Sequence, residues 1–183
     1  MSARVTTWSP EELAARSEEV LDVYAEAMGV PRPLAGARRT VLAGHLGRPG
    51  LRAVAALDDA GALVGTAYGH LGEDGQWWHD QVVAALRAQG GDDVAGGWSG
   101  SFEVCELHVR PAHQGTGLGR ALLALLLRDV PAPRALLTTP DEETRARAFY
   151  RAGGWVDLVR RLRFPGDPRD FAVLGLQVGA DRV

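Results

Sequence analysis

Three amino acids are absent from the 183 residues: the chain has no lysine, no asparagine and no isoleucine. A Walker A phosphate loop requires a lysine, so that nucleotide-binding motif is excluded. The single cysteine, Cys105, excludes an internal disulfide and a metal site built from several cysteines. The five histidines form no HxxxH or HxH pair, so we expect no metal.

The chain also lacks an apolar run long enough to span a membrane, and its first residues lack the apolar stretch of a signal peptide. A formal net charge of −3 argues against nucleic acid or an anionic membrane as the main partner. With 46% hydrophobic and 23% charged residues, the composition is that of a globular protein. We expect one cytoplasmic domain over residues 1–183.

The most informative stretch is residues 102–128, which predict a strand, a turn and a helix in that order. Residues 102–109 are rich in β-branched and apolar side chains, as strands are. The turn that follows carries glycines at spacing two, at Gly115, Gly117 and Gly119. Residues 118–128 are an apolar run of strong helix formers, which indicates a buried helix.

A glycine-rich turn that leads into a helix favours phosphate binding. The first N–H groups of a helix have no intrahelical partner, and the helix dipole places partial positive charge there. Glycines let an anion approach the backbone closely. A Rossmann fingerprint fits poorly, because the glycines follow the strand at a distance and lie past the middle of the chain.

Two motifs resemble one family. Gln114-Gly-Thr-Gly-Leu-Gly119 resembles Q/R-x-x-G-x-G/A, the acyl-CoA pyrophosphate loop of the GCN5-related N-acetyltransferase (GNAT) superfamily. Downstream, Ala146-Arg-Ala-Phe-Tyr150-Arg-Ala-Gly-Gly-Trp155 is similar to that family's A-x-x-F/L-Y-x-x-x-G-F/W. The resemblance covers roughly residues 51–178.

The resemblance implies an α/β (α+β) fold with a mixed, mostly antiparallel seven-stranded sheet, flanked by helices and splayed between strands 4 and 5. The residue patterns place strands at 5–8, 51–57, 63–71, 102–109, 134–139, 155–164 and 171–178. They place helices at 10–28, 34–46, 76–89, 118–128 and 140–152, with loops on both sides of 76–89. Residues 73–100 are an insertion relative to a minimal family domain.

The resemblance also implies acetyl-CoA as acyl donor and assigns its binding residues. The pyrophosphate loop would comprise Gln114, Gly115, Thr116, Gly117, Leu118, Gly119 and Arg120. The preceding strand would contribute the backbones of Leu107, His108 and Val109, which would pair with pantetheine. One N–H there, that of Val109, would polarise the acyl carbonyl.

For catalysis, the resemblance places Tyr150 as the general acid that protonates the sulfur of CoA, since a neutral phenol has a proton to give. The base is left open between Glu103, Glu106 and a water chain. A regular strand would place the two carboxylates on opposite faces, and a bulge between them would change that. Two positions depart from relatives: Thr138 replaces a glutamate of enzymes that act on protein N-termini, and Glu143 replaces a common asparagine.

We therefore predict an N-acyltransferase that transfers acetyl from acetyl-CoA to a primary amine of a small molecule, by direct attack in a ternary complex. The alternatives are an acyl-CoA-binding sensor without catalysis and a protein N-terminal or lysine acetyltransferase. The insertion carries Trp77, Trp78 and Trp98, which should pack on the domain, on a second subunit of a homodimer or around a ligand. Its acidic residues would suit a cationic amine.

Overall fold

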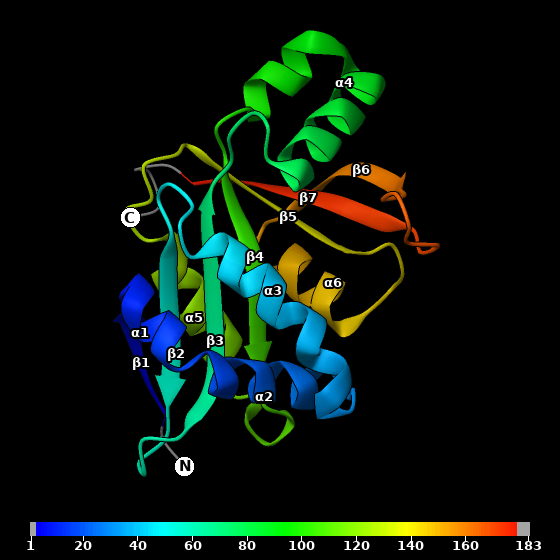
Figure 1. Cartoon of the computed structure of the whole chain (residues 1–183). Coiled ribbons are helices and arrows are strands. Elements are labelled where there is room, and N and C mark those ends of the chain that lie inside the picture. Colours follow the sequence, from blue (N-terminus) through cyan, green and yellow to red (C-terminus); the bar gives the residue numbers. More distant parts are fainter. Residues whose placement is uncertain (1–2, 179–183) are drawn as a thin grey trace. The chain divides into compact units, whose positions relative to one another are not determined.

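The computed structural model describes residues 3–178, which form two compact units. Unit 1 is the chain up to His70 together with Val104–Val130, and unit 2 is Leu71–Glu103 together with the chain from Pro131 onward. Figure 1 labels the helices and strands. Within the described residues, no helix is both long and apolar enough to cross a membrane. That the whole chain acts as one domain stays a prediction.

Unit 1 contains most of the first half of the chain and the central helix. Its elements, in chain order, are β1 (Arg4–Trp8), α1 (Pro10–Ala15), α2 (Ser17–Met28), η1 (Arg32–Ala35), α3 (Gly36–His45), β2 (Arg52–Leu57), β3 (Leu63–Leu71), β4 (Phe102–Val109), η2 (Pro111–His113) and α5 (Leu118–Leu127). The last residue of β3 and the first two of β4, Phe102 and Glu103, belong to unit 2. Strands β1, β2 and β3 pair antiparallel in sequence order. The boundaries agree with the sequence patterns except at one helix.

That exception lies in the first helical segment, which was predicted as one helix and is two. Ser9 begins α1 with a capping box, because its hydroxyl accepts from the N–H of Glu12 and the Glu12 carboxylate accepts from the N–H of Ser9. The chain leaves the helical conformation at Arg16, with φ −105° and ψ 20°. Arg16 there binds Glu19 at 2.6 Å and stacks over the ring of Trp8, which stabilises the break.

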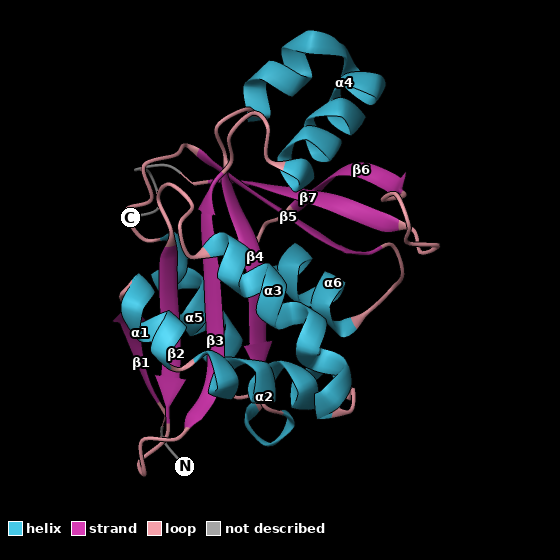
Figure 2. Cartoon of the chain, in the orientation of Figure 1, coloured by secondary structure: helices cyan, strands magenta, loops and turns pink. Residues whose placement is uncertain are grey.

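The strands of unit 1 are covered on both faces. Figure 2 shows α2 and α3 on the near side of β2 and β3, and α5 on the far side. The near-side cluster includes Val20 of α2, Leu42 of α3 and Ala55 of β2. On the other face, a Cβ built on Gly65 of β3 would lie 3.1 Å from Leu122 of α5, so glycine there permits close helix packing. These contacts fix α2, α3 and α5 against the strands that carry the candidate site.

Unit 2 contains the insertion and the last strands. Its elements are α4 (Trp77–Trp98), β5 (Arg134–Pro140), α6 (Arg145–Ala152), β6 (Val156–Leu162) and β7 (Phe171–Gln177). β7 pairs antiparallel with both β5 and β6. A second apolar cluster joins Val82 and Leu86 of α4 to Leu136 of β5 and Val173 of β7, so the insertion is packed against the strands of its own unit.

The insertion is more helical than its sequence predicted. α4 runs to Trp98 and is interrupted only at Gly91, whose φ of 79° and ψ of −176° make a kink where loops were expected. Trp98 lies against Gly175 and under the guanidinium of Arg134, while Trp78 donates to Thr138 at 3.3 Å. Packing of these side chains extends the helix past its glycines.

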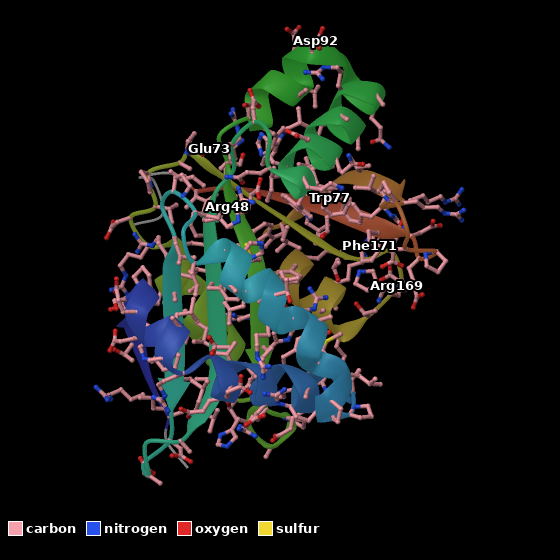
Figure 3. The ribbon with its side chains drawn as sticks, viewed as in Figure 1. Arg48, Glu73, Trp77, Asp92, Arg169 and Phe171 are labelled. Carbon is pink, nitrogen blue, oxygen red and sulfur yellow. The ribbon has the colours of Figure 1, made fainter. Side chains whose placement is uncertain are left out.

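Unlike Trp78 and Trp98, the third tryptophan of the insertion, Trp77, is largely exposed, with 56% of its surface accessible to solvent. Its ring lies 5.4 Å from that of Phe164, which in turn contacts Phe171. Figure 3 labels Trp77 and Phe171, and it shows Asp92 at the tip of α4. The Asp92 carboxylate binds Arg87 of the same helix at 2.6 Å.

α6 begins later than predicted, at Arg145 instead of Pro140. Thr144 is its N-cap, and the Thr144 hydroxyl accepts from the N–H of Arg147 at 3.1 Å. Asp141 is drawn away from the helix because its carboxylate binds the buried guanidinium of Arg147 at 2.6 Å and that of Arg160 at 2.5 Å. A strong local cap and these ion pairs outweigh the favourable position of acids in a first turn.

The seven strands follow the hydrogen-bonded order β1-β2-β3-β4-β5-β7-β6. This is the mixed, mostly antiparallel sheet that the resemblance implied. β4 and β5 are its parallel pair, and they pair at Phe102↔Ala135 and Glu103↔Leu136, the first two residues of β4. The sequence prediction of the fold is confirmed.

Candidate active site

The glycine loop, residues 114–120, lies in unit 1 between η2 and α5. Gly115 and Gly117 have φ of 78° and 86°, a region that side chains with a Cβ rarely adopt. A Cβ added at either position would meet no atom within 4 Å. The backbone conformation therefore requires glycine here, and the space in front of the loop is open.

The loop ends in the amino terminus of α5. Gly117 is the N-cap, and no side chain of the described residues caps that end. The N–H groups of Leu118, Gly119 and Arg120 belong to the first turn and lack intrahelical partners. The buried side chain of Leu118 anchors the turn, while Arg120 is exposed. With the helix dipole, this arrangement suits a phosphate group.

Two polar side chains hold the loop in shape. The amide of Gln114 donates to the carbonyl of Val109 at 2.9 Å, which ties the loop to the end of β4. The hydroxyl of Thr116 donates to the carbonyl of His113 at 2.8 Å. Because these two side chains serve the loop itself, its backbone amides and the exposed Arg120 are the groups that could contact an anion.

The end of β4 carries the three residues predicted to bind through their backbones. The side chain of Val109 is buried, near Gly65 and Leu122. Leu107 is half-buried. His108 instead contacts α2, where its ring meets Tyr24 edge to face at 5.1 Å. Val109 thus packs toward α5, and His108 packs toward α2.

Glu106 lies beside His108 in what we call the Glu106 cluster: Glu106, His108, Arg38 and Tyr24, all in unit 1. The Oε2 of Glu106 is 2.5 Å from the Nε2 of His108, and its Oε1 accepts from Arg38 at 3.1 Å. The guanidinium of Arg38 lies 5.2 Å above the ring of Tyr24. Only 14% of the Glu106 side chain and 13% of the His108 side chain are exposed.

Two consecutive side chains of β4, those of Cys105 and Glu106, both come close to α3. In a regular strand, successive side chains point to opposite faces. Yet Glu106 binds Arg38 of α3, and the sulfur of the preceding Cys105 lies within 4.8 Å of a ring nitrogen of His45, also on α3. A bulge would explain why two consecutive side chains reach one helix, and the bulge itself stays a prediction.

Glu103 lies in unit 2 and has a different environment. It is 3% exposed, and its Oε1 is 2.8 Å from the Nδ1 of His79 on α4. This hydrogen bond raises the pKa of His79 above its usual value. A Cβ built on Gly72 would lie 2.3 Å from the same carboxylate oxygen, so the pair is enclosed. Sequence reasoning missed His79 as its partner, because nothing in the short motifs marks that residue.

Tyr150 lies on α6 in unit 2 and is half-buried. Its ring contacts those of Phe149 and Trp155 at 5.1 and 5.7 Å, edge to face. The two positions that depart from relatives have structural partners: Thr138 accepts from Trp78, and Glu143 binds Arg151. Unit 1 therefore holds the glycine loop and the Glu106 cluster, and unit 2 holds Tyr150 and the Glu103–His79 pair.

Comparison with known proteins shows which family the chain belongs to. The model of the acetyltransferase (GNAT) family matches residues 17–154. The chain belongs to that family. It is also 36% identical, over 91% of its length and 93% of the relative's, to a GCN5-like protein acetyltransferase of Mycobacterium tuberculosis.

Solved structures of GNAT proteins share the fold. The ribosomal-protein-S18-alanine N-acetyltransferase of Escherichia coli matches with a TM-score of 0.64 and 14% identity, over 100% of this chain and 99% of that one. A GNAT superfamily phosphinothricin acetyltransferase of Sinorhizobium meliloti, in complex with acetyl-CoA, matches with a TM-score of 0.57 and 20% identity, over 98% and 90%. At these identities the likeness concerns the fold alone.

Proposed function

We propose that this GNAT protein transfers an acetyl group from acetyl-CoA to a primary amine of a small molecule, by direct attack in a ternary complex. The observation that carries the proposal is that unit 1 contains both features a transferase of this kind needs. One is the start of α5, which follows the glycine loop and has no side-chain cap among the described residues, and the other is the Glu106 cluster. The first feature suits the pyrophosphate of CoA, and the second offers a base.

The donor is held through backbone groups. The amides of residues 114–120 bind the pyrophosphate, and Arg120 adds a charged donor. The backbones of Leu107, His108 and Val109 pair with pantetheine, and the N–H of Val109 polarises the thioester carbonyl. CoA supplies the activated acyl group, so the chain needs only to orient it and to move protons.

The base is the Glu106–His108 pair. Both carboxylate oxygens of Glu106 are engaged, one by Arg38 and the other by His108. A neutral His108 that donates its Nε2–H to Glu106 carries a lone pair on Nδ1. That nitrogen accepts the proton of the attacking amine, and Glu106 holds the ring in this tautomer and stabilises the imidazolium.

The reaction then balances as follows. The amine nitrogen forms a bond to the acetyl carbon, the bond from that carbon to sulfur breaks, and the nitrogen loses one proton to the base. Tyr150 gives its phenolic proton to the departing thiolate, and solvent later restores it. Because Glu106 and His108 are mostly buried, only a slender amine-bearing group would reach them.

Acetylation of a protein amine is the second candidate. It is favoured by the mycobacterial relative, whose name describes a protein acetyltransferase and which matches almost the whole chain. A lysine side chain presents the same slender primary amine as a small molecule. The Glu106 cluster would treat both acceptors alike at the reacting nitrogen.

The test incubates the purified chain with acetyl-CoA and a panel of amines, amino acids, polyamines and lysine-containing proteins. Release of CoA is followed with a thiol reagent, and acetylated products are identified by mass spectrometry. Turnover with a small amine supports the first proposal, and acetyl-lysine in a protein supports the second. Tight binding of acetyl-CoA without turnover of any acceptor would contradict both and leave a sensor.

A further inference from the structure

Three metal-ligand side chains converge in unit 1 although they are far apart in the sequence. His45 ends α3, His70 lies on β3 and Cys105 lies on β4. One ligand atom from each, an imidazole nitrogen or the sulfur, lies within 4.8 Å of the other two. The rings of His45 and His70 meet edge to face at 5.1 Å. None of the three has a role in the reaction proposed above.

Two imidazoles and one thiolate form a donor set that zinc favours. Zinc binds histidine nitrogen at about 2.0–2.1 Å and cysteine sulfur at about 2.3 Å, usually in a tetrahedron, which places donor atoms roughly 3.5 Å apart. The separations here are no more than 4.8 Å, so the gap to close is at most about 1.3 Å, which side-chain rotation can provide. Three protein ligands leave a fourth position for water.

The state of His45 gives independent support. Its Nδ1 is buried and has no hydrogen-bond partner among the described residues. An orphaned polar atom of this kind needs an explanation, and a missing ion is one.

The surroundings would strengthen a metal bond. Cys105 packs against the apolar cluster of unit 1, and the ring of Tyr68 lies 5.9 Å from that of His45. His70 is buried, while His45 and Cys105 are half-buried, so water has limited access to compete for the ligands. The cluster also adjoins the Glu106 cluster, because Glu106 follows Cys105 on β4 and Arg38 shares α3 with His45.

We propose that His45, His70 and Cys105 form a site for Zn²⁺, which ties the end of α3 to β3 and β4. Binding forms a zinc–thiolate bond and releases the thiol proton to solvent. The histidine spacing in the sequence argued against a metal, because it contains no short-range histidine pair. Residues 45, 70 and 105 meet only in the folded chain.

Zinc titration of the full chain tests this proposal. The protein is stripped of metal, kept reduced with a phosphine instead of a thiol, and titrated against a chromophoric chelator. The variants are His45→Ala and Cys105→Ser, and His113→Ala is the matched control outside the cluster. We expect one zinc per chain, with affinity at least about tenfold lower in either cluster variant and unchanged in His113→Ala.

Cobalt provides a second readout that does not depend on affinity. Co²⁺ in the same site should give a thiolate-to-cobalt charge-transfer band that disappears in Cys105→Ser. Thermal unfolding shows which variants are folded, and zinc should raise the Tm of the parent chain but not that of His45→Ala. The proposal is overturned if the parent chain does not compete with the chelator, or if folded His45→Ala and Cys105→Ser bind zinc as the parent does.

Discussion

Glu103 and Glu106 are three residues apart on β4, yet they belong to different units and have different partners. Glu103 is enclosed in unit 2, where it binds the buried His79 of the inserted helix. Glu106 lies in unit 1 between Arg38 and His108 and retains some access to solvent. Each carboxylate binds a histidine. The Glu103–His79 pair is enclosed, whereas the Glu106–His108 pair is partly accessible to solvent and so could contact a substrate.

The difference shows how surroundings decide the role of one residue type. A buried carboxylate that binds a buried histidine stabilises packing, and removing either member leaves an uncompensated polar group. A carboxylate that orients an accessible histidine can support proton transfer. We therefore propose that the Glu103–His79 pair serves the stability of unit 2 and that the Glu106–His108 pair serves catalysis. The predictions below separate these two assignments.

The largest effect is expected for His108→Ala, which removes the proposed base. The rate should fall by about 10²–10⁴-fold, the usual contribution of a general base. Steady-state kinetics at saturating acetyl-CoA measures it, and calorimetry should show that acetyl-CoA still binds. A normal rate in the folded variant would mean that the base lies elsewhere.

Tyr150→Phe should have the next largest effect. It keeps the ring contacts with Phe149 and Trp155 and removes only the phenolic proton. The rate should drop on the order of 10²-fold with acetyl-CoA affinity nearly intact. If the purified variant turns over normally, Tyr150 only packs and another group protonates CoA.

Gly117→Glu should weaken donor binding, because it adds bulk and negative charge at the helix start. Acetyl-CoA affinity should fall by well over tenfold, or about 1.4 kcal/mol and more. The matched control is Gly61→Glu, because Gly61 has a similar φ of 82° and equally open space in the β2–β3 turn. If calorimetry gives both variants the same affinity for acetyl-CoA as the parent, the glycine loop does not bind the pyrophosphate of CoA.

Glu103→Gln should destabilise the fold by about 1–3 kcal/mol, since a buried partner of His79 loses its charge. The direction in which the free energy of unfolding changes with pH follows from the raised pKa of His79. The stabilisation is present below the unfolded pKa of about 6.5 and is lost as pH rises through the folded pKa. Urea unfolding across that range should show this slope in the parent and not in Glu103→Gln.

The matched control for that experiment is Glu73→Gln, an exposed carboxylate early in the insertion. Its free energy of unfolding should stay within about 0.5 kcal/mol of the parent value at every pH. A pH slope that persists unchanged in Glu103→Gln would show that His79 does not owe its raised pKa to Glu103.

The sequence predicted what depends on local spacing. The glycine loop and the seven strands follow from residues close together in the chain, and the structure has them. The sequence could not predict the continuation of α4 beyond Gly91, because it depends on the packing of Trp98. Nor could it predict the late start of α6, because that depends on the ion pairs of Asp141. The cytoplasmic location and the homodimer remain predictions.

The catalytic base stayed open for a related reason. Whether Glu103 or Glu106 reaches a site depends on partners that come from other elements. His79 lies on the inserted helix, and Arg38 lies on α3. The convergence of His45, His70 and Cys105 was hidden in the same way, since each comes from a different element. Long-range pairing of this kind has no signature in a single sequence.

Paired kinetics of Glu106→Gln and Glu103→Gln test the central claim most directly. Both substitutions neutralise a carboxylate of β4 and keep its size. At saturating acetyl-CoA, the account predicts that Glu106→Gln loses on the order of 10²-fold in kcat, because the amide cannot hold His108 in its basic tautomer. Folded Glu103→Gln should stay within about twofold of the parent rate. A larger loss of kcat in Glu103→Gln than in Glu106→Gln would contradict the assignment.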